Sequence, residues 1–255
     1  MLDQAKIPTF TAECIIGDTP QLIPNPTLLV RANSALFYKE QLFNMLEPRI
    51  PKQYKNLIFM DSDIIFSEPD WVDRISHKLK TYTVVQPFSK VVFTGPTLAP
   101  INTELTSSVK RFRETGQING HPGFCWAISR SHFKAMGKFF DKCIIGSGDS
   151  MLANYLMKIY VPFTYDFIYK HYLQWRLRIF LLPVAFTYLN MTIYHLYHGD
   201  TRARQYSGRH KILKLYTITS WDEAVYKNTD GMYELKDKSI NNIFKKYFLS
   251  RREDD

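Results

Sequence analysis

The feature that most constrains this chain is residues 57–66, where an apolar run leads into Asp61 and Asp63 and a second apolar run follows. A continuous hydrophobic run is typical of a buried parallel strand, which would place both carboxylates at its carboxyl end. Side chains alternate along extended backbone, so the two aspartates are expected to point the same way. Two neighbouring carboxylates in an apolar setting need a cation or a proton to offset repulsion and lost hydration. The stretch therefore predicts a site for Mg²⁺ or Mn²⁺, and the alternative is a turn with two solvated aspartates.

The chain has 33 Lys and Arg residues against 24 Asp and Glu, a formal net charge of +9. Such a charge suits nucleic acid, an anionic membrane surface or an anionic substrate such as a nucleotide diphosphate. The aromatic residues lie in apolar runs rather than among the basic ones, so no nucleic-acid partner is expected. The hydrophobic fraction of 45% excludes disorder for most of the chain.

Cysteine usage and hydropathy bear on the compartment. Cys14, Cys125 and Cys143 show no CxxC spacing, so they are expected to be buried thiols in a reducing compartment. The first residues lack the basic start and apolar core of a secretory signal. The most apolar later stretch, residues 179–194, is too short to span a membrane comfortably and contains Pro183. The sequence predicts a cytoplasmic protein without a transmembrane segment.

Strand and helix patterns alternate in the first third of the chain. Ser34 is expected to cap a helix at residues 35–47, which Pro48 ends. Strands are expected at residues 8–16, 28–30, 57–63 and 81–88, with a second helix at 69–79. This order predicts an α/β fold with a mixed, mostly parallel sheet flanked by helices. Ligands of such sheets bind beyond the carboxyl ends of the strands, where the two aspartates fall.

The remaining two thirds carry weaker signals. Residues 89–123 are expected to be irregular apart from one helix near 103–114. Further elements are expected as a strand at 124–129, helices at 131–140, 149–156 and 163–182, strands within 184–194, and a final helix. No repeat, low-complexity tract or linker interrupts the chain, so residues 1–255 are expected to form a single domain.

Two later positions are candidates for chemistry. Asp149 is expected in the first turn of a helix, where a carboxylate either caps free N–H groups or, next to small residues, stays open to a ligand. His195 and His198 would face opposite ways on a strand, so only one is expected to meet the aspartates. The glycine after His198 favours that one, because it permits a tight turn around a site. The basic run that follows, with Arg202 and Arg204, would hold a diphosphate or form a solvated basic face.

Three stretches, taken in this order, resemble glycosyltransferases of the GT-A fold. Residues 57–66 match the apolar strand with its Asp-x-Asp motif, and residues 147–154, Ser-Gly-Asp-Ser-Met-Leu-Ala-Asn, resemble the segment that holds the acidic base in β-1,4-galactosyltransferases. Residues 193–198, Ile-Tyr-His-Leu-Tyr-His, resemble the strand that supplies their third metal ligand. The run after His198 is also similar to viral and bacterial members, including those of large DNA viruses; a viral member would act in the host cytoplasm. The resemblance spans roughly residues 30–215.

The resemblance implies a metal-dependent transferase that moves a sugar from a nucleotide-diphosphate sugar to a hydroxyl of a glycan or glycoprotein acceptor, with inversion. It implies that Asp61, Asp63 and His198 hold Mn²⁺ or Mg²⁺ and that Asp61 also binds the donor. Asp149 is implied as the base that deprotonates the acceptor.

The resemblance also concerns the donor pocket. Ser34 and Lys39 are candidate nucleotide contacts, and Arg202 and Arg204 are candidate diphosphate contacts. Trp126 falls where relatives line the sugar pocket, although a core tryptophan is the simpler expectation. The first strand of the fold has no evident counterpart, so the domain is expected to be shortened at its N-terminus.

Two other functions stay open. A haloacid-dehalogenase-type phosphatase also places Asp-x-Asp after an apolar strand, but it would not need a late His-Gly, and Asn154 stands where a second late acid is expected. A glycosyltransferase-like module without activity would retain binding alone.

Overall fold

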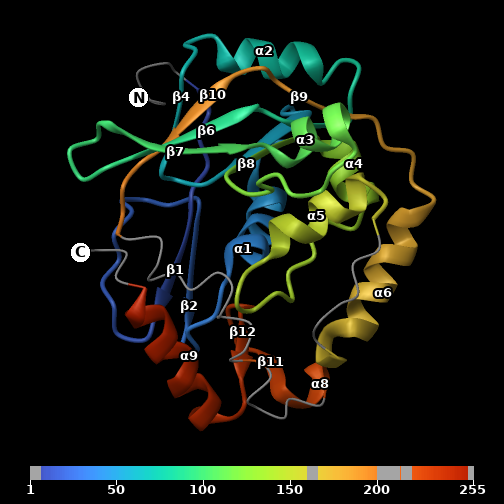
Figure 1. Cartoon of the computed structure of the whole chain (residues 1–255). Coiled ribbons are helices and arrows are strands. Elements are labelled where there is room, and N and C mark those ends of the chain that lie inside the picture. Colours follow the sequence, from blue (N-terminus) through green and yellow to red (C-terminus); the bar gives the residue numbers. More distant parts are fainter. Residues whose placement is uncertain (1–6, 160–165, 200–212, 214–219, 252–255) are drawn as a thin grey trace.

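The computed structural model describes residues 7–159, 166–199, 213 and 220–251. Two four-stranded sheets form its centre, in the strand orders β3-β8-β5-β9 and β4-β10-β6-β7, and two further strand pairs, β1-β2 and β11-β12, flank them (Figure 1). The strands are β1 Ala12–Ile16, β2 Leu28–Ala32, β3 Asn56–Met60, β4 Ile64–Phe66, β5 Val84–Gln86, β6 Lys90–Thr94, β7 Pro100–Thr106, β8 Cys125–Ser129, β9 Phe186–Tyr188, β10 Thr192–His195, β11 Val225–Lys227 and β12 Tyr233–Leu235.

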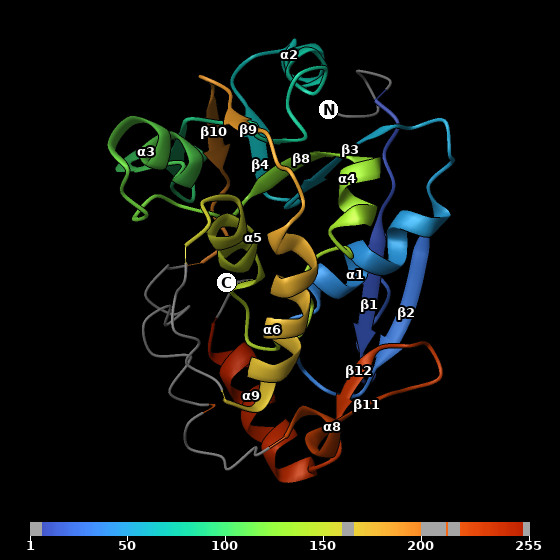
Figure 2. The same cartoon turned by 90° about the vertical axis from the view of Figure 1, so that its right-hand side faces the viewer.

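The helices surround these sheets on several sides. Both views place α2 at one end of the molecule and the C-terminal elements at the other, with α5 and α6 packed together between them (Figures 1 and 2). The helices are α1 Lys39–Leu46, the 3-10 turn η1 Glu47–Arg49, α2 Trp71–Lys78, α3 Ser108–Thr115, α4 Arg130–Ala135, α5 Gly148–Leu156, α6 Asp166–Phe180, α8 Trp221–Ala224 and α9 Lys238–Ser250. No described helix is long and apolar enough to cross a membrane.

The predicted mixed α/β class is confirmed, but the expected predominance of parallel strands is wrong. Among the described strands, three pairings are parallel and five are antiparallel. β3 itself lies at a sheet edge and pairs only with β8, antiparallel. The apolar run does not reflect parallel pairing; it arises because both faces of β3 are covered by other parts of the protein. Leu57 and Phe59 enter the largest core cluster, whereas Ile58 and Met60 pack against two smaller clusters on the other side.

Burial on two faces is also visible in β5. Val84 belongs to the large core shared with α4, α5 and α6, and its neighbour Val85 packs under α2 with Trp71 and Ile75. Alternation therefore sends successive apolar side chains into different cores, and an antiparallel sheet with two covered faces gives the same uninterrupted pattern as a parallel one.

Two local predictions are wrong. The first helix begins at Lys39 rather than residue 35, and Ser34 does not cap it: its buried Oγ accepts a hydrogen bond from the Leu235 N–H at 2.9 Å. Residues 89–123 are not mostly irregular, because β6 and β7 form an antiparallel pair there before α3. The turn between the two strands begins at Gly95, whose N–H donates to the Ala99 carbonyl at 2.8 Å.

Arg130, at the start of α4, connects the start of β3 and the end of β8 to the end of α1. Its Nε lies 2.6 Å from Glu47 Oε1, and its other nitrogens donate to the carbonyls of Glu47, Ile50 and Pro51 at 2.8 to 2.9 Å. Both side chains of the ion pair are buried. A guanidinium saturated with acceptors is well suited to such a place, since each N–H needs a partner.

Replacing Arg130 by Met should lower the free energy of unfolding by about 3 to 5 kcal/mol. The buried Glu47 carboxylate loses its closest partner and keeps only the more distant Lys134 and Lys138, and the carbonyls of Glu47, Ile50 and Pro51 lose their donor. Urea unfolding measures the change. The exposed pair of Arg74 with Glu68 and Asp70 supplies the control, and Arg74→Met should leave the urea midpoint nearly unchanged. Equal effects of the two substitutions would contradict the structural role assigned to Arg130.

Candidate metal centre and acid–base cluster

The two aspartates of residues 57–66 lie in a turn beyond the end of β3. The Asp61 N–H donates to the Phe124 carbonyl at 2.8 Å, and the Asp63 carbonyl accepts from the Leu196 N–H at 2.8 Å. Extended backbone ends at Met60, so strand alternation does not govern the aspartates. Each carboxylate has its own set of partners: Lys39 for Asp61, and the two histidines for Asp63.

Asp63 forms a compact group with two histidines from the end of β10. Its Oδ2 lies 2.7 Å from His198 Nε2 and 3.3 Å from His195 Nε2, and the two Nε2 atoms are 3.3 Å apart. Ligand atoms bound at about 2.1 Å to one ion are separated by roughly 3.0 Å in octahedral and 3.4 Å in tetrahedral geometry. The three atoms thus have the spacing of ligands on a shared metal ion.

The lowered pKa of Asp63 is consistent with a role as a metal ligand. Burial alone would raise its pKa, but the hydrogen bond with His195 and the charges of His195 and His198 outweigh burial and lower the pKa of Asp63. Its second oxygen, Oδ1, is buried and has no hydrogen-bond partner in the described protein. A buried carboxylate oxygen without a donor is costly, and a cation would offset that cost. These residues therefore fit the metal that the sequence implies.

His195 is the candidate ligand that sequence reasoning missed. β10 ends at His195, so His198 lies outside the strand and the rule that residues three apart face opposite ways does not apply. Thr94 fixes the turn: its Oγ1 donates to the His195 carbonyl and accepts from the Tyr197 N–H. Gly199 has φ +92°, which ends the segment in a conformation that glycine adopts readily. Both histidines consequently reach Asp63.

Asp61 and Asp149 belong to a second group, which is centred on Lys39. The Lys39 Nζ lies 2.6 Å from Asp149 Oδ2 and 3.1 Å from Asp61 Oδ1. Burial would lower the pKa of Lys39, but the charges of Asp149, Asp61 and Glu40 outweigh it and raise that pKa well above its usual value. The ammonium therefore stays charged at neutral pH and bridges α1, the loop after β3 and the start of α5.

Asp149 does not serve as a helix cap in the described structure. The N-cap of α5 is Ser147, with φ +94° and no capping bond from its side chain. The hydrogen bond that Asp149 accepts comes instead from Lys39. Its side chain is 25% exposed, so one side of the carboxylate is open to a ligand.

Glu40 completes this group, and nothing in the sequence singled it out. Its side chain is buried against Gly148, where any Cβ would overlap the carboxyl group, and its Oε1 has no hydrogen-bond partner among the described residues. Burial raises the pKa of Glu40 to about 8, with Lys39 opposing and Asp149 adding to the shift. Burial also raises the pKa of Asp61 to about 6. A glutamate in the first turn of a helix looks favourable on the surface, so only tertiary packing reveals its burial.

The segment before β8 lines the space next to Lys39. Phe124, Cys125 and Trp126 border a narrow cavity of about 10 Å³ together with Lys39, Asp61 and Asp149. Trp126 is a core residue whose Nε1 donates to the Pro122 carbonyl, as the simpler expectation had it. Phe124 has φ +77°, an uncommon value for a residue with a side chain, and it presents the carbonyl that holds Asp61.

The structure brings some of the predicted site residues together and separates others. The structure brings Asp63 together with His198, and Lys39 together with Asp61 and Asp149. Asp61 lies outside the three-ligand group, and Ser34 is bonded to the backbone of β12. Arg202 and Arg204 lie outside the described residues. No protein-family model matches this chain, and no curated protein was found to match it.

Replacing Lys39 by Met should destabilise the protein in a pH-dependent way. The Asp61 and Glu40 carboxyl groups then lose the nearby cation, and their pKa values in the folded state rise further above the unfolded values. The folded state binds more protons than the unfolded state, so stability falls as pH rises. We expect a loss of about 2 to 4 kcal/mol at pH 8 and a clearly smaller loss at pH 5, measured by urea unfolding. Lys90→Met, which removes an exposed ion pair with Glu104, should show little change at either pH. Equal losses at pH 5 and pH 8 for Lys39→Met would rule out the charge-compensating role.

Proposed function

We propose that this protein is a metal-dependent glycosyltransferase that moves a sugar from a nucleotide-diphosphate sugar to an acceptor hydroxyl, with inversion at the anomeric carbon. The observation that carries the proposal is the juxtaposition of two groups on one short loop: Asp63 with His195 and His198, and two residues earlier Asp61 with Lys39 and Asp149. A metal-ligand group beside an open carboxylate is what transfer from a diphosphate donor requires.

The donor atoms favour one of the two predicted ions. Mg²⁺ prefers oxygen ligands and retains several waters, whereas imidazole nitrogen suits transition metals. With His195 and His198 beside Asp63, the group supports Mn²⁺ over Mg²⁺. When bound, Mn²⁺ would supply Lewis-acid compensation for the charge that develops on the diphosphate leaving group.

The chain's own residues then account for proton transfer. Asp149 accepts the proton of the acceptor hydroxyl as its oxygen forms a bond to the anomeric carbon and the bond from that carbon to the diphosphate breaks, with the electron pair leaving on the diphosphate. Lys39, 2.6 Å from Asp149 Oδ2, orients the carboxylate and compensates its charge before the proton arrives. Glu40 and Gly148 close the buried side of the group, so the acceptor approaches from the exposed side of Asp149.

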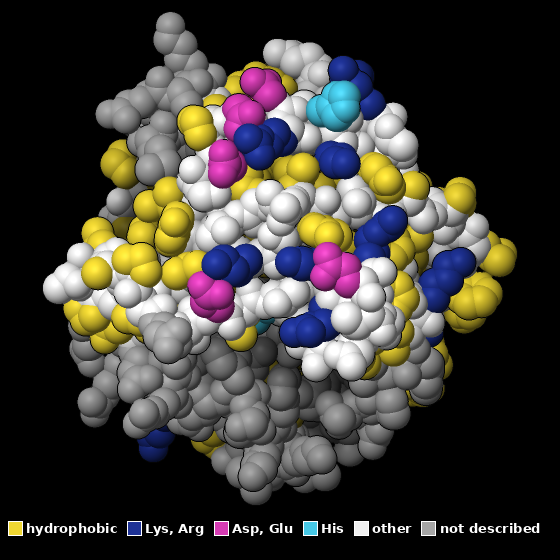
Figure 3. Space-filling view, turned by 45° about the horizontal axis from the view of Figure 1, so that its top comes forward, with side chains coloured by type: hydrophobic (Ala, Val, Ile, Leu, Met, Phe, Trp, Pro, Cys, Tyr) yellow, Lys and Arg dark blue, Asp and Glu magenta, His cyan; other side chains and the backbone are white. Residues whose placement is uncertain are grey.

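The alternatives receive less support. In a phosphatase of the haloacid-dehalogenase type Asp61 would be the nucleophile that becomes phosphorylated, whereas here its Oδ1 is paired with the Lys39 ammonium at 3.1 Å. Nucleic-acid binding would favour a continuous basic surface. On the face that carries α2, basic and acidic side chains are interspersed (Figure 3), with Arg74 paired to Glu68 and Asp70 and Lys90 to Glu104.

Mn²⁺ together with one of UDP, GDP or CDP should raise the thermal unfolding temperature by several degrees, because a ligand at a hundred times its Kd adds about 2.7 kcal/mol to stability. A panel of the three nucleotides with Mn²⁺, Mg²⁺ or EDTA measures the effect and identifies the base. His198→Ala should remove the Mn²⁺-dependent part. If no nucleotide with Mn²⁺ stabilises the wild-type protein, the proposal is wrong.

Asp149→Asn should reduce sugar transfer by at least about a hundredfold, since an amide cannot accept the acceptor proton, and leave Mn²⁺-nucleotide binding unchanged. Transfer is measured by release of nucleoside diphosphate, and binding by the same thermal shift. Loss of binding together with transfer would assign Asp149 a structural role.

Two outcomes would support the alternatives. Trapping of a phosphorylated Asp61 would establish the phosphatase, and nucleotide binding without transfer in the wild type would establish a binding module.

A further inference from the structure

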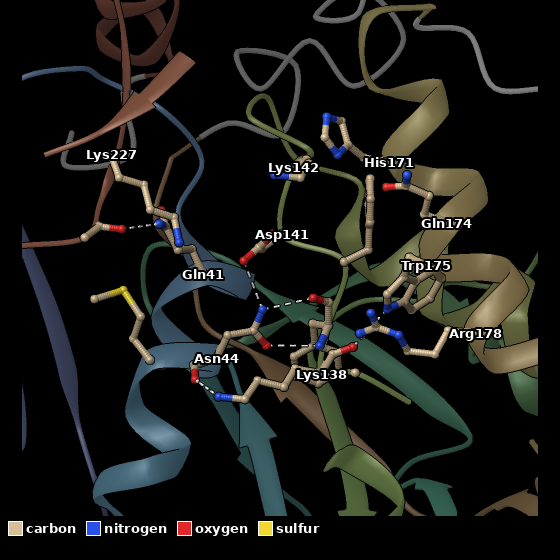
Figure 4. A pocket seen from close by; sticks show the side chains of 15 residues that line it. Gln41, Asn44, Lys138, Asp141, Lys142, His171, Gln174, Trp175, Arg178 and Lys227 are labelled. Atoms are coloured by element: carbon tan, nitrogen blue, oxygen red, sulfur yellow. Dashed lines mark hydrogen bonds between the residues drawn. The ribbon is translucent and has the colours of Figure 1, made fainter. Parts of the chain in front are cut away.

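A second cavity lies on the other side of α1. It encloses about 470 Å³ between α1, the segment from Gly137 to Lys142, α6 and β11 (Figure 4). Gln41, Asn44 and Met45 form its α1 wall, whereas Lys39, Glu40 and Phe43 of the same helix border the narrow cavity at the Asp149 group. The helix therefore separates two sites. A volume of this size lies within the range of small-molecule pockets.

Three cations in the lining have no carboxylate partner. Neither Lys142, Arg178 nor Lys227 forms an ion pair with any residue that the structure describes. Lys138, in contrast, donates to the Asn44 carbonyl and lies 3.8 Å from Glu47 Oε2. This difference leaves a net positive cavity.

The carboxylate in the lining is already engaged elsewhere. Asp141 accepts hydrogen bonds from Asn44 Nδ2 at 3.2 Å and from the Tyr233 hydroxyl at 3.3 Å. The amide of Asn44 in turn donates to the Phe139 carbonyl, and its oxygen accepts from the Phe139 N–H. Polar groups on this wall thus satisfy one another, whereas none of the three cations forms an ion pair with Asp141 or with any other described carboxylate.

Aromatic rings hold two of these cations in place without neutralising them. The Lys142 Nζ lies 4.3 Å from the ring centre of Trp221 and 4.8 Å from that of Tyr233, and the Lys227 Nζ lies 5.2 Å from the ring centre of Tyr233. Lys142 also donates to the Tyr233 hydroxyl at 3.3 Å. Burial lowers the pKa of Lys142, Asp141 and Asp222 oppose the shift, and Lys227 adds to it. Two like charges around one ring repel each other, and an anion between them would relieve that repulsion.

The third cation comes from α6. Arg178 lies over Gly137, where a Cβ would approach its Nη1 to 2.6 Å. The exposed amide of Gln174 and the ring of Trp175, whose Nε1 donates to the Lys138 carbonyl, line the same wall. This side of the cavity offers a guanidinium, an amide and an aromatic face, which suits the polar organic part of a ligand beside its charged group.

We propose that this cavity is a second ligand site, which binds a small organic phosphate, with Lys142 and Lys227 at the phosphate and Arg178 at the organic part. A phosphate monoester carries nearly two negative charges at neutral pH and offers three acceptor oxygens, so it suits two neighbouring lysines better than a single carboxylate does. The cavity is also larger than a phosphate group alone needs, which leaves room for the organic part. The site is separate from the metal group and does not depend on it.

Binding of glucose 6-phosphate and of inorganic phosphate tests the proposal, with EDTA present to remove any contribution from metal. The double substitution Lys142→Gln with Lys227→Gln should weaken binding of glucose 6-phosphate at least tenfold by calorimetry. Lys52→Gln with Lys80→Gln is the matched control, because both lysines are exposed and the net charge changes equally. It should change the affinity less than twofold.

Protein labelled with 5-fluorotryptophan locates the ligand. Glucose 6-phosphate should shift the fluorine resonances of Trp175, which lines the cavity, and of Trp221, which contacts Lys142. The resonance of Trp71, which begins α2 and packs in a separate core cluster, should not shift. Equal weakening by the two double substitutions, or shifts that miss Trp175 and Trp221, would overturn the site. If inorganic phosphate binds as tightly as the ester, the cavity does not recognise the organic group. If neither probe binds at 10 mM, the whole proposal is wrong.

Discussion

Negative charge in a poorly hydrated place is the constraint on which the middle of this protein depends. Four carboxyl groups, those of Glu40, Asp61, Asp63 and Asp149, converge between α1, the loop after β3 and α5, and burial disfavours charge on each of the three for which a pKa shift is resolved. The protein meets this cost in three ways. Lys39 supplies an ammonium to Asp61 and Asp149, the two histidines of the β10 end supply partners to Asp63, and Glu40 is held toward its protonated form.

These solutions depend on backbone that is fixed elsewhere. The loop of the two aspartates is held from both sides, by the Phe124 carbonyl before β8 and by the Leu196 N–H after β10. β3 and β8 are paired over their full length, and Arg130 ties the far end of that pair to the end of α1. The same helix begins with Lys39, so the position of the ammonium and the position of the loop are set by one packed unit.

The two sides of α1 face side chains of different charge. The side with Lys39 and Glu40 faces clustered acids and the metal-ligand group, which suits a cation and proton transfer. The side with Gln41 and Asn44 faces the cavity lined by Lys142, Arg178 and Lys227, which suits an anion. An eight-residue helix thus separates potentials of opposite sign, and each side could bind a ligand that the other would repel.

The sequence by itself predicted much of the scaffold and identified the candidate residues for a site. The apolar runs located β3, β5 and β8, and Asp61, Asp63, Asp149, His198 and Lys39 were recognised as the residues of interest. The partners of these residues, however, were decided by the tertiary structure. His195 was set aside because strand alternation was extended beyond the end of β10, and Glu40 was missed because a first-turn acid looks solvated. Lys39 meets Asp149 across 110 residues of sequence. Such contacts depend on where helices and strands pack rather than on local periodicity, and the balance between burial and compensating charge that fixes each carboxylate's partner exists only once those elements are assembled.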